Sequence, residues 1–335
     1  MEVMWFSFLA FMITMYVVLD GFDLGVGALH LLLGRTEDDR EQATAAIGPV
    51  WNGNEVWLIA AGGVLFMIFP KVYAAAFSGL YFGLILALWL LVGRGLGLEL
   101  RHQVDNPLWR QACDAVFALS SAGLAFVFGV ALGNVVRGVP LGPDGYFHLA
   151  LFDVLDRYAV LVGVFGVVVL CTHGAGFLAF RTDGELAARA RRWARALVWP
   201  EAVLFVALVV PTHAVREEML TNLVDDPWRL VFPVLAVAAL AALIVFQRRR
   251  LWVRAFAASS LFVVGLLTTV AAGLYPNVLP AREGAAGSLT VENAIAGDTV
   301  LRTALIWWPL ALALAGVYFA LAYRMVVVPV RDRRA

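Results

Sequence analysis

WNGNEVWLIAAGGVLFMIF, residues 51–69, is an apolar run long enough to cross a membrane, and it opens with two carboxamides and a carboxylate. An ionisable group inside such a helix is costly and commonly has a function. In helical projection Asn52 and Glu55 share a face, which predicts one polar stripe and leaves Val56 and Ile59 for packing. The polar stripe therefore requires a partner from protein or water.

The rest of the chain has the same apolar character. Of its 335 residues 62% are hydrophobic and 15% are charged, and its mean hydropathy is +0.83, which leaves too little polar surface for a soluble domain. Nine hydrophobic runs are long enough to cross about 30 Å of hydrocarbon. They cover residues 3–33, 47–69, 72–98, 107–137, 156–180, 193–214, 228–247, 251–275 and 301–325. The sequence thus predicts an all-α polytopic membrane protein, with residues 1–335 forming a single integral membrane domain.

The positions of the 25 basic residues predict how the chain is oriented, although the net charge is zero. With the N-terminus outside, 18 of them fall on the inside of the membrane and seven on the outside, as the positive-inside rule requires. The inside residues are Arg35, Arg40, Arg94, Arg101, Arg110, Arg181, Arg189, Arg191, Arg192, Arg195, Arg248, Arg249, Arg250, Arg254, Arg324, Arg331, Arg333 and Arg334. Nine spans then place the N-terminus outside and Arg331–Arg334 in the cytoplasm. The same rule and lipid headgroups explain the basic runs, so no nucleic-acid partner is expected.

Several other classes of site are excluded by the sequence. The first apolar segment carries Asp20 and Asp23 and has no small-residue cleavage site, so it is expected to be a retained span. Cys113 and Cys171 fall in different predicted helices, without the neighbours of a zinc site or a reactive thiol. No phosphate-binding glycine loop, nucleophile elbow or dinucleotide fingerprint is present.

Acidic residues inside the spans concentrate at one predicted depth. Counted at about 1.5 Å per residue, Asp20, Glu55 and Asp114 all fall in the inner half of their helices. Asp23 follows Asp20 by three residues, among glycines that would let another helix approach closely. These acids either form a functional stripe or merely satisfy nearby arginines and helix N-termini; for Asp114, four residues after Arg110, both interpretations remain open.

The histidines test whether this chain could bind heme, because a b-type heme needs axial ligands buried in facing helices. His102 falls in an inside loop, and His148 and His213 lie near the outer surface. His30 and His173 fall near inner helix ends, where a capping or proton-exchanging role is commoner than ligation. The sequence predicts that this chain binds no heme and no metal.

Motifs spread over nearly the whole chain resemble subunit II of the bacterial cytochrome bd-type quinol oxidases. The segments that carry the resemblance are LDGFDLGVG (19–27), GPVWNGNEVWL (48–58), FPKVYAAAFSGLY (69–81), GRGLGLELR (93–101), LYPNVLP (274–280) and SLTVENA (288–294). The resemblance implies nine transmembrane helices, arranged as two four-helix bundles and a peripheral helix, in the bacterial inner membrane. It also implies pairing with a subunit I that carries two b-type hemes and one d-type heme, oxidises quinol and reduces dioxygen to water.

The same resemblance implies a role for particular residues in a cytoplasmic proton path. The family's acidic position in W-[DN]-G-N-x-V-W falls on Asn52, whose carboxamide cannot relay a proton, and Glu55 could supply the missing carboxylate. Asp114 matches another proposed relay acid, Asp23 matches a further acidic position, and Trp57 matches an aromatic residue near the channel. The expected path contains Asp20, Asp23, Glu55 and Asp114, with Asn52, Asn54 and Trp57 holding water and orientation. A bound quinone or lipid and a small single-helix accessory subunit are further implied partners.

Two other functions fit parts of the sequence. Nine spans, intramembrane carboxylates and a proline-broken helix at Trp199-Pro200-Glu201 are also features of secondary transporters. A purely structural membrane anchor is the third possibility. Co-purification with a second, heme-bearing subunit distinguishes the oxidase from the transporter, and the density of matching motifs favours the oxidase.

Overall fold

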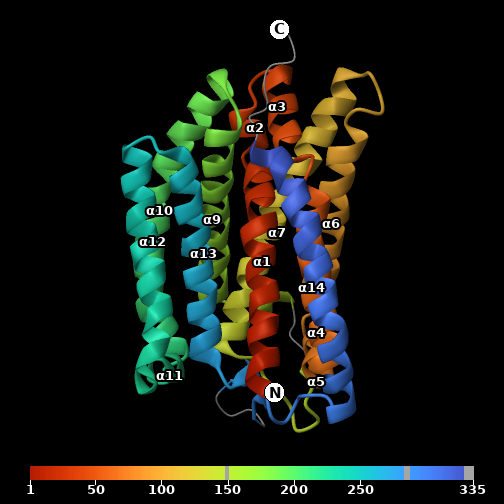
Figure 1. Ribbon diagram of the computed structural model, residues 1–335, viewed down its shortest axis with the longest axis vertical. Helices are drawn as coiled ribbons and strands as arrows, with labels where there is room; N and C mark the ends of the chain where they lie inside the picture. Colours follow the sequence, from red (N-terminus) through yellow and green to blue (C-terminus); the bar gives the residue numbers. More distant parts are fainter. Residues whose placement is uncertain (148–150, 283–286, 328–335) are drawn as a thin grey trace.

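The computed structural model describes residues 1–147, 151–282 and 287–327, and long helices running side by side dominate this part of the chain (Figure 1). The long helices are α1 (Glu2–Ala28), α4 (Trp51–Ile68), α6 (Tyr81–Leu100), α7 (Pro107–Arg137), α9 (Arg157–Arg181), α10 (Gly184–Val215), α12 (Val231–Arg248), α13 (Trp252–Leu274) and α14 (Asp298–Val327). The short elements are α2 (His30–Leu33), α3 (Glu37–Ile47), α5 (Pro70–Gly79), α8 (Leu151–Val154), α11 (Glu218–Asp225), the 3-10 turn η1 (Pro227–Leu230), β1 (Asn277–Leu279) and β2 (Leu289–Thr290). The N-terminus lies at the end opposite α2 and α3, which we call the α3 end.

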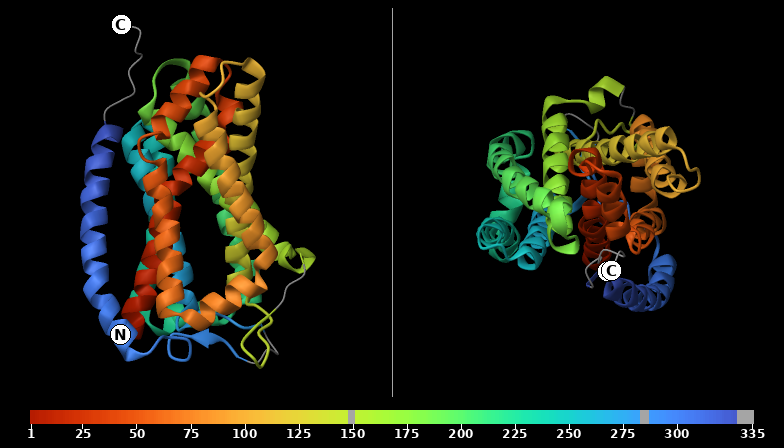
Figure 2. Two further views of the ribbon diagram at one scale, coloured as in Figure 1. Left: turned by 90° about the vertical axis from the view of Figure 1, so that its right-hand side faces the viewer. Right: turned by 90° about the horizontal axis from the view of Figure 1, so that it is seen from above.

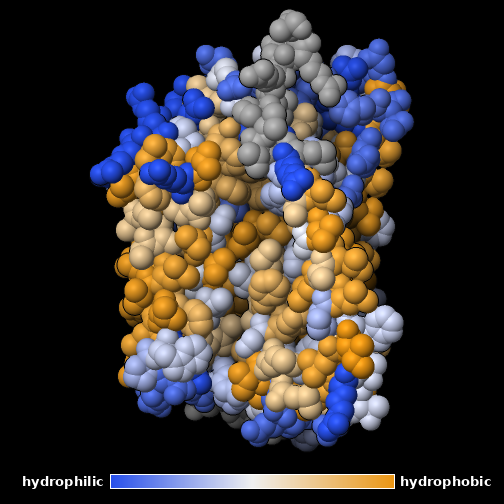
Figure 3. All heavy atoms as spheres, viewed as in Figure 1, coloured by the Kyte–Doolittle hydropathy of each residue, from blue (hydrophilic) through white to orange (hydrophobic). Residues whose placement is uncertain are grey.

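Within the described residues, eight helices are long and apolar enough to cross a membrane, and the bent pair α4–α5 makes a ninth candidate. Hydrophobic residues form a broad band around the middle of the visible face, with hydrophilic residues at both ends (Figure 3). The prediction of an all-α polytopic membrane protein is therefore confirmed. The expected cytoplasmic segment Arg331–Arg334 lies outside the described residues.

Capping residues explain why several predicted helix ends are accurate. The Asn106 side chain accepts a hydrogen bond from Leu108 N at 2.8 Å, and Pro107 follows as the first residue of α7. At the other end of α7, Gly138 takes a φ of 89°, which stops the helix. The Asp156 side chain caps α9 in the same way, accepting from Tyr158 N at 2.9 Å.

The predicted third span, residues 72–98, is wrong at its start. α5 is a separate helix that begins at Pro70 and bends by 118° from α4 (Figure 2). Phe69 and Leu80 both have non-helical backbone angles, so α5 is bounded on either side. A proline at the first helical position fits a new helix better than a continuing one, because its ring removes a backbone donor.

The predicted break at Trp199-Pro200-Glu201 is also wrong. α10 runs without interruption from Gly184 through Pro200 and Pro211 to Val215. A proline removes one hydrogen bond from a helix, and neighbouring helices can hold the remaining turns in place. α10 also begins well before the predicted start at residue 193, because the basic residues there continue the helix beyond its apolar part.

α1 is the central helix and packs against α4, α7, α9 and α13. Its predicted glycine-mediated contact is present, since a β-carbon on Gly25 would collide with the backbone of Leu170 and Gly174 in α9. α14 lies at the edge, mostly exposed, and contacts α4 (Figure 2). The division into two bundles of four helices stays a prediction.

Candidate functional site

A buried arginine joins two of the predicted acids in a set that we call the Arg94 cluster (Asp20, Glu55 and Arg94). Arg94 Nη1 in α6 lies 2.7 Å from Asp20 Oδ1 and 2.9 Å from Oδ2, and both side chains are at most 1% exposed. Arg94 Nη2 lies 3.7 Å from Glu55 Oε2, and the Glu55 side chain is 26% exposed. Two carboxylates thus share one guanidinium group, which leaves Glu55 as the acid that can bind or release a proton without breaking the Asp20 pair.

A second set of contacts places Asp23 beside this cluster. Asn54 Nδ2 donates to Asp23 Oδ2 at 2.7 Å and to Leu19 O at 3.1 Å, while Tyr323 donates its hydroxyl to Asn54 Oδ1 at 2.9 Å. Asp23 is 1% exposed, and its Oδ1 has no hydrogen-bond partner among the described residues. Asn54 and Glu55 are consecutive in α4. The same helix turn therefore binds Asp23 through Asn54 and places Glu55 beside Arg94.

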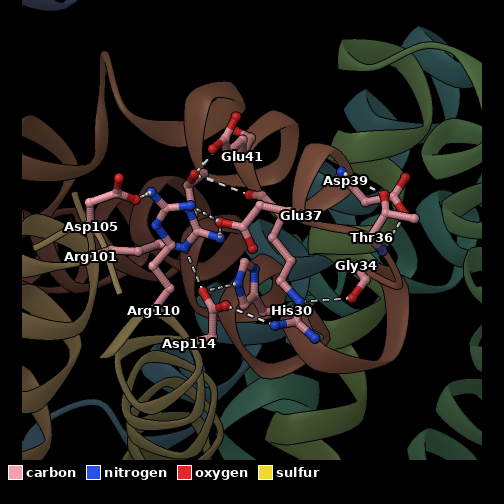
Figure 4. Close-up of polar contacts among 12 residues, drawn as sticks. His30, Gly34, Thr36, Glu37, Asp39, Glu41, Arg101, Asp105, Arg110 and Asp114 are labelled. Atoms are coloured by element: carbon pink, nitrogen blue, oxygen red, sulfur yellow. Dashed lines mark hydrogen bonds and ion pairs between the residues drawn. The ribbon is translucent and has the colours of Figure 1, made fainter. Parts of the chain in front are cut away.

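Asp114 belongs to a separate set of polar and charged side chains at the α3 end, the Asp114 cluster (His30, Glu37, Arg40, Arg101 and Asp114), of which Figure 4 labels all but Arg40. Asp114 Oδ1 accepts from His30 Nε2 at 2.8 Å and from Arg101 Nε at 2.7 Å, and Oδ2 accepts from Arg40 Nη1 at 3.0 Å. Arg101 also donates to Glu37 Oε1 at 2.8 Å. Burial disfavours the charge of Arg101, but the bonds to Asp114 and Glu37 outweigh it and raise the pKa of this guanidinium. These contacts tie α2, α3 and the ends of α6 and α7 together.

The prediction that all the acids lie at one depth is wrong. Asp114 is level with His30, which follows Asp23 by seven residues, so it lies roughly 10 Å closer to the α3 end at 1.5 Å per residue. Asp114 and Glu55 therefore belong to different layers. The sequence left open that Asp114 merely satisfies nearby arginines, and its contacts match this interpretation. The arginines are Arg40 and Arg101, however, and not Arg110.

The predicted polar stripe on α4 is wrong for Asn52. Asn52 is exposed and lies on the outward side with Val56 and Ile59, which are 53% and 72% exposed. Asn54 faces inward instead and is fully buried, because its side of α4 contacts Leu19 and Asp23 of α1 and Tyr323 of α14. Trp57 lies on that face and stacks on Phe319 with 5.5 Å between ring centroids. Its position near the acids is therefore maintained by aromatic packing.

A polar cleft of about 590 Å³ opens at the α3 end between α3, α4 and α6. Its lining comprises Glu41, Thr44, Ala45, Gly48, Trp51, Leu98, Glu99, His102 and Gln103. The Arg94 guanidinium group lies over the ring of Trp51, 5.8 Å from the ring centroid. The indole of Trp51 thus lies between the cleft and the Arg94 cluster.

Sequence reasoning missed Arg94 by assigning it to an inside loop, whereas it lies within α6 and is buried. The signal that was available is the run of glycines around it. At Gly97 a β-carbon would lie 2.8 Å from both Cys113 O and Phe117 N, so α6 and α7 approach too closely for a side chain there. Tyr323 had no local signal, because its partner Asn54 is 269 residues away.

His173 is buried and engaged through both ring nitrogens. Nε2 lies 3.0 Å from Val18 O and Nδ1 lies 2.9 Å from Ser259 Oγ. Because a carbonyl oxygen only accepts, Nε2 carries the proton and Nδ1 accepts from the serine hydroxyl. His30 is likewise engaged, through Nε2, with Asp114. Groups of three or more histidine, cysteine or acidic side chains that could hold a metal are not found among the residues described; His148 lies outside them.

Comparison with known proteins agrees with these observations. The family model for cytochrome bd terminal oxidase subunit II matches residues 1–326. A probable cytochrome oxidase subunit 2 of Haemophilus influenzae is 32% identical, over 95% of this chain and 91% of its own length. Cytochrome bd-I ubiquinol oxidase subunit 2 of Escherichia coli K12 and cytochrome bd ubiquinol oxidase subunit 2 of Bacillus subtilis are each 32% identical as well. These two alignments cover 89% of this chain, with 86% of the first relative and 88% of the second.

The fold has a counterpart among solved structures. A chain of the bd oxidase from Geobacillus thermodenitrificans superposes with a TM-score of 0.76 and 18% sequence identity, covering 97% of this chain and 98% of the other. At that identity the likeness concerns the fold alone.

Proposed function

Because this chain belongs to the cytochrome bd terminal oxidase subunit II family and is thus part of a quinol oxidase, we propose that it pairs with a heme-bearing subunit I and conducts protons to it. The hemes of that partner would oxidise quinol and reduce dioxygen to water. This chain would bring cytoplasmic protons to that reaction. The observation that carries the proposal is the Arg94 cluster, which adjoins Trp51 of the polar cleft through Arg94 and follows directly on the Asp23 partner Asn54 through Glu55.

The proposed orientation puts the α3 end in the cytoplasm of a bacterium and the N-terminus outside its inner membrane. Its support is the excess of basic residues on the α3 side. The cleft would then open to the cytoplasm, with Glu41, Glu99 and His102 as its titratable walls. A reporter that is active only in the cytoplasm, fused after Ala335, is expected to give a signal; a silent reporter on a stable protein would reverse the topology.

The proposed route leads from the cleft past Trp51 to Glu55 and from there to Asp23. Glu55 is the partly exposed member of the Arg94 cluster, so it can exchange a proton with water near the cleft. Asp20 pairs with Arg94, so Glu55 can gain or lose its proton while the buried guanidinium group keeps its counter-ion. Asp23 has one carboxylate oxygen with no hydrogen-bond partner within residues 1–147, 151–282 and 287–327, and this oxygen can accept the proton next. The bonds that Asn54 makes would fix its orientation.

Two residues of the expected path have different proposed roles. Asp114 would anchor the α3 end, since both of its oxygens are engaged by cationic or ring donors. Asn52 lies on the outward side of α4, off the proposed route. A carboxylate placed there would face away from Asp23, so it is not expected to replace Glu55.

We also propose that this chain carries no heme of its own. The support is that buried histidine nitrogens already have partners. Both nitrogens of His173 form hydrogen bonds, and His30 Nε2 bonds to Asp114. Axial ligation by His173 would require breaking one of these buried contacts, and ligation by His30 would have to use Nδ1, which has no hydrogen-bond partner among the described residues.

Glu55→Gln tests the proton route, because it preserves the size of the side chain and removes the titrating group. In the purified complex we expect quinol oxidation to fall by about ten- to a thousandfold, with unchanged heme absorption bands. Glu185→Gln is the matched control, since the Glu185 side chain is 83% exposed at the start of α10. Glu55→Asp should retain part of the activity. Wild-type turnover and proton uptake in Glu55→Gln would make the Arg94 cluster a structural feature.

A further inference from the structure

Away from the Arg94 cluster, Glu201 and Gln247 are buried side chains whose polar atoms make no hydrogen bond to any other residue that the structure describes. Glu201 in α10 is 0% exposed, and neither carboxyl oxygen has a hydrogen-bond partner among the described residues. Gln247 in α12 is 1% exposed, and both its amide atoms are likewise without a partner there. Buried polar groups are almost always hydrogen-bonded, so each of these requires an explanation.

The two side chains lie on α10 and α12, which contact each other within two residues of both. The Arg248 guanidinium group lies 5.5 Å from the ring centroid of Trp199, which places the end of α12 beside the turn of α10 that contains Glu201. Trp199 and Arg248 are on the surface, whereas Glu201 and Gln247 are buried.

α9 and α13 contribute further polar groups to the same interior. Thr172 in α9 lies beside the Glu201 carboxyl group, while its own hydroxyl donates to Val168 O at 2.9 Å. The next residue, His173, bonds Ser259 of α13 at 2.9 Å. Each of the four helices α9, α10, α12 and α13 thus contributes polar side chains that are at most 1% exposed. These side chains are Thr172, His173, Glu201, Gln247 and Ser259.

There is also unoccupied volume beside Thr172. Gly176 lies one turn further along α9 on the same face and is buried, yet a β-carbon built there would meet no heavy atom within 4 Å. Gly174 in the same helix is the opposite case, since a β-carbon there would collide with Gly25 of α1. The helix is therefore packed closely against α1 and loosely on its Thr172–Gly176 face.

We propose that this interior is a hydrated site, in which Glu201 is a neutral carboxylic acid and water connects its carboxyl group to the Gln247 amide. Glu201 forms no ion pair within the described part of the chain, and an isolated carboxylate in an apolar interior is far more costly than the neutral acid. A neutral acid and an amide each both donate and accept, which matches water. A buried water needs two to four such polar groups and a space to occupy, and both are present.

Infrared spectroscopy of the assembled complex tests the protonation of Glu201. The C=O stretching region of protonated carboxyl groups should contain a band that disappears in Glu201→Gln. Glu185→Gln is the control for an exposed glutamate and should leave that band in place. If Glu201→Gln removes no protonated-carboxyl band, then Glu201 is ionised and the proposal fails.

Transfer of the complex into D₂O tests the hydration. The Glu201 band should shift promptly in the wild type, because water reaches the acid. Gly176→Val, which fills the hollow, should slow the shift by about tenfold or more, corresponding to about 1.4 kcal/mol in the barrier. Gly316→Val, at an exposed position in α14, is the matched control and should leave the rate unchanged.

If the Gly176→Val variant does not assemble, Gly176→Ala takes its place in the same D₂O experiment, since the added methyl group fits the space. A wild-type band that does not shift in D₂O would show a dry site and overturn the proposal. Exchange at the wild-type rate in the Gly176 variants would overturn the assignment of the hollow as the place that water occupies.

Discussion

Arg94 and Asp20 form a fully buried ion pair in which one guanidinium nitrogen lies within 2.9 Å of both carboxylate oxygens. The pair joins α6 to α1, the central helix of the fold. Charges at this depth in a membrane protein are expensive and persist only when they are matched. Arg94 is therefore an internal structural cation as well as the partner of Glu55.

Replacing Arg94 by methionine should leave the Asp20 carboxylate buried without a partner. We expect a loss of about 3–5 kcal/mol in the free energy of unfolding, visible as a lower thermal inactivation temperature of the complex. The double variant with Asp20→Asn should recover much of the loss, because it removes the stranded charge. Arg302→Met, at an exposed position, is the control. A single variant as stable as the wild type would mean that Asp20 is satisfied in another way.

Asp114→Asn should affect stability more than turnover. The asparagine removes the charge that holds His30, Arg40 and Arg101 together, so we expect destabilisation of about 3–5 kcal/mol. Turnover per assembled complex should stay close to that of the wild type. Asp105→Asn, whose side chain is 95% exposed, should change stability by less than about 0.5 kcal/mol. Normal stability with lost turnover would instead make Asp114 a relay group.

His30→Gln and His173→Gln together should leave the heme absorption bands of the assembled complex intact. Glutamine keeps a donor and an acceptor, so the buried bonds to Asp114 and Val18 are partly preserved. We expect a stability cost of about 1–3 kcal/mol for each site, measured by thermal inactivation. Loss of a heme band at normal subunit stoichiometry would show that one of the two histidines is a ligand.

The contacts of Asp39 lead us to expect that the α3 end loses stability as the pH falls. Partial burial works against its charge, but hydrogen bonds from Thr36 and the bond with Arg189, at 2.6 Å, lower the pKa of Asp39 below its ordinary value. A depressed pKa in the folded state stabilises the fold above the unfolded-state pKa of about 3.9, and this contribution is lost as the pH falls through the folded value. Asp39→Asn should therefore reduce stability at neutral pH and flatten the loss below about pH 4. Parallel acid-inactivation curves for both proteins would contradict this.

Much of the fold was predictable because each membrane helix is marked in the sequence by its own hydrophobic run. The ends of α7 and α9 coincide with the predicted ends to within about a residue, since caps and glycines mark them in the sequence. The α4–α5 bend and the continuity of α10 through Pro200 were not predictable in this way. Both depend on what neighbouring helices allow a proline to do, which a single sequence does not state.

The candidate site was predictable by residue type and only partly by contact. Asp20, Asp23, Asn54 and Glu55 do lie together, because they occupy helices that pack side by side. The inward direction of α4 does not follow from the sequence, since Asn52 and Asn54 are both polar and helical periodicity alone does not decide which one faces α1. The burial of Arg94 does not follow from the positive-inside rule either, because that rule counts basic residues without regard to whether they are paired.

The length of α4 has an electrical consequence. With 18 residues it measures about 27 Å, slightly less than the hydrocarbon thickness of about 30 Å, and the cleft that reaches Trp51 brings the aqueous phase to its first turn. The membrane voltage then falls across the thickness that remains beyond the cleft. On the proposed route, a proton that moves from the cleft past Trp51 to Glu55 would begin its passage through the field there, at up to about 2.3 kcal/mol of work per 100 mV for the full thickness. If protons follow the proposed route, the position of Trp51 would set how much of the electrical work of proton transfer is done within this subunit.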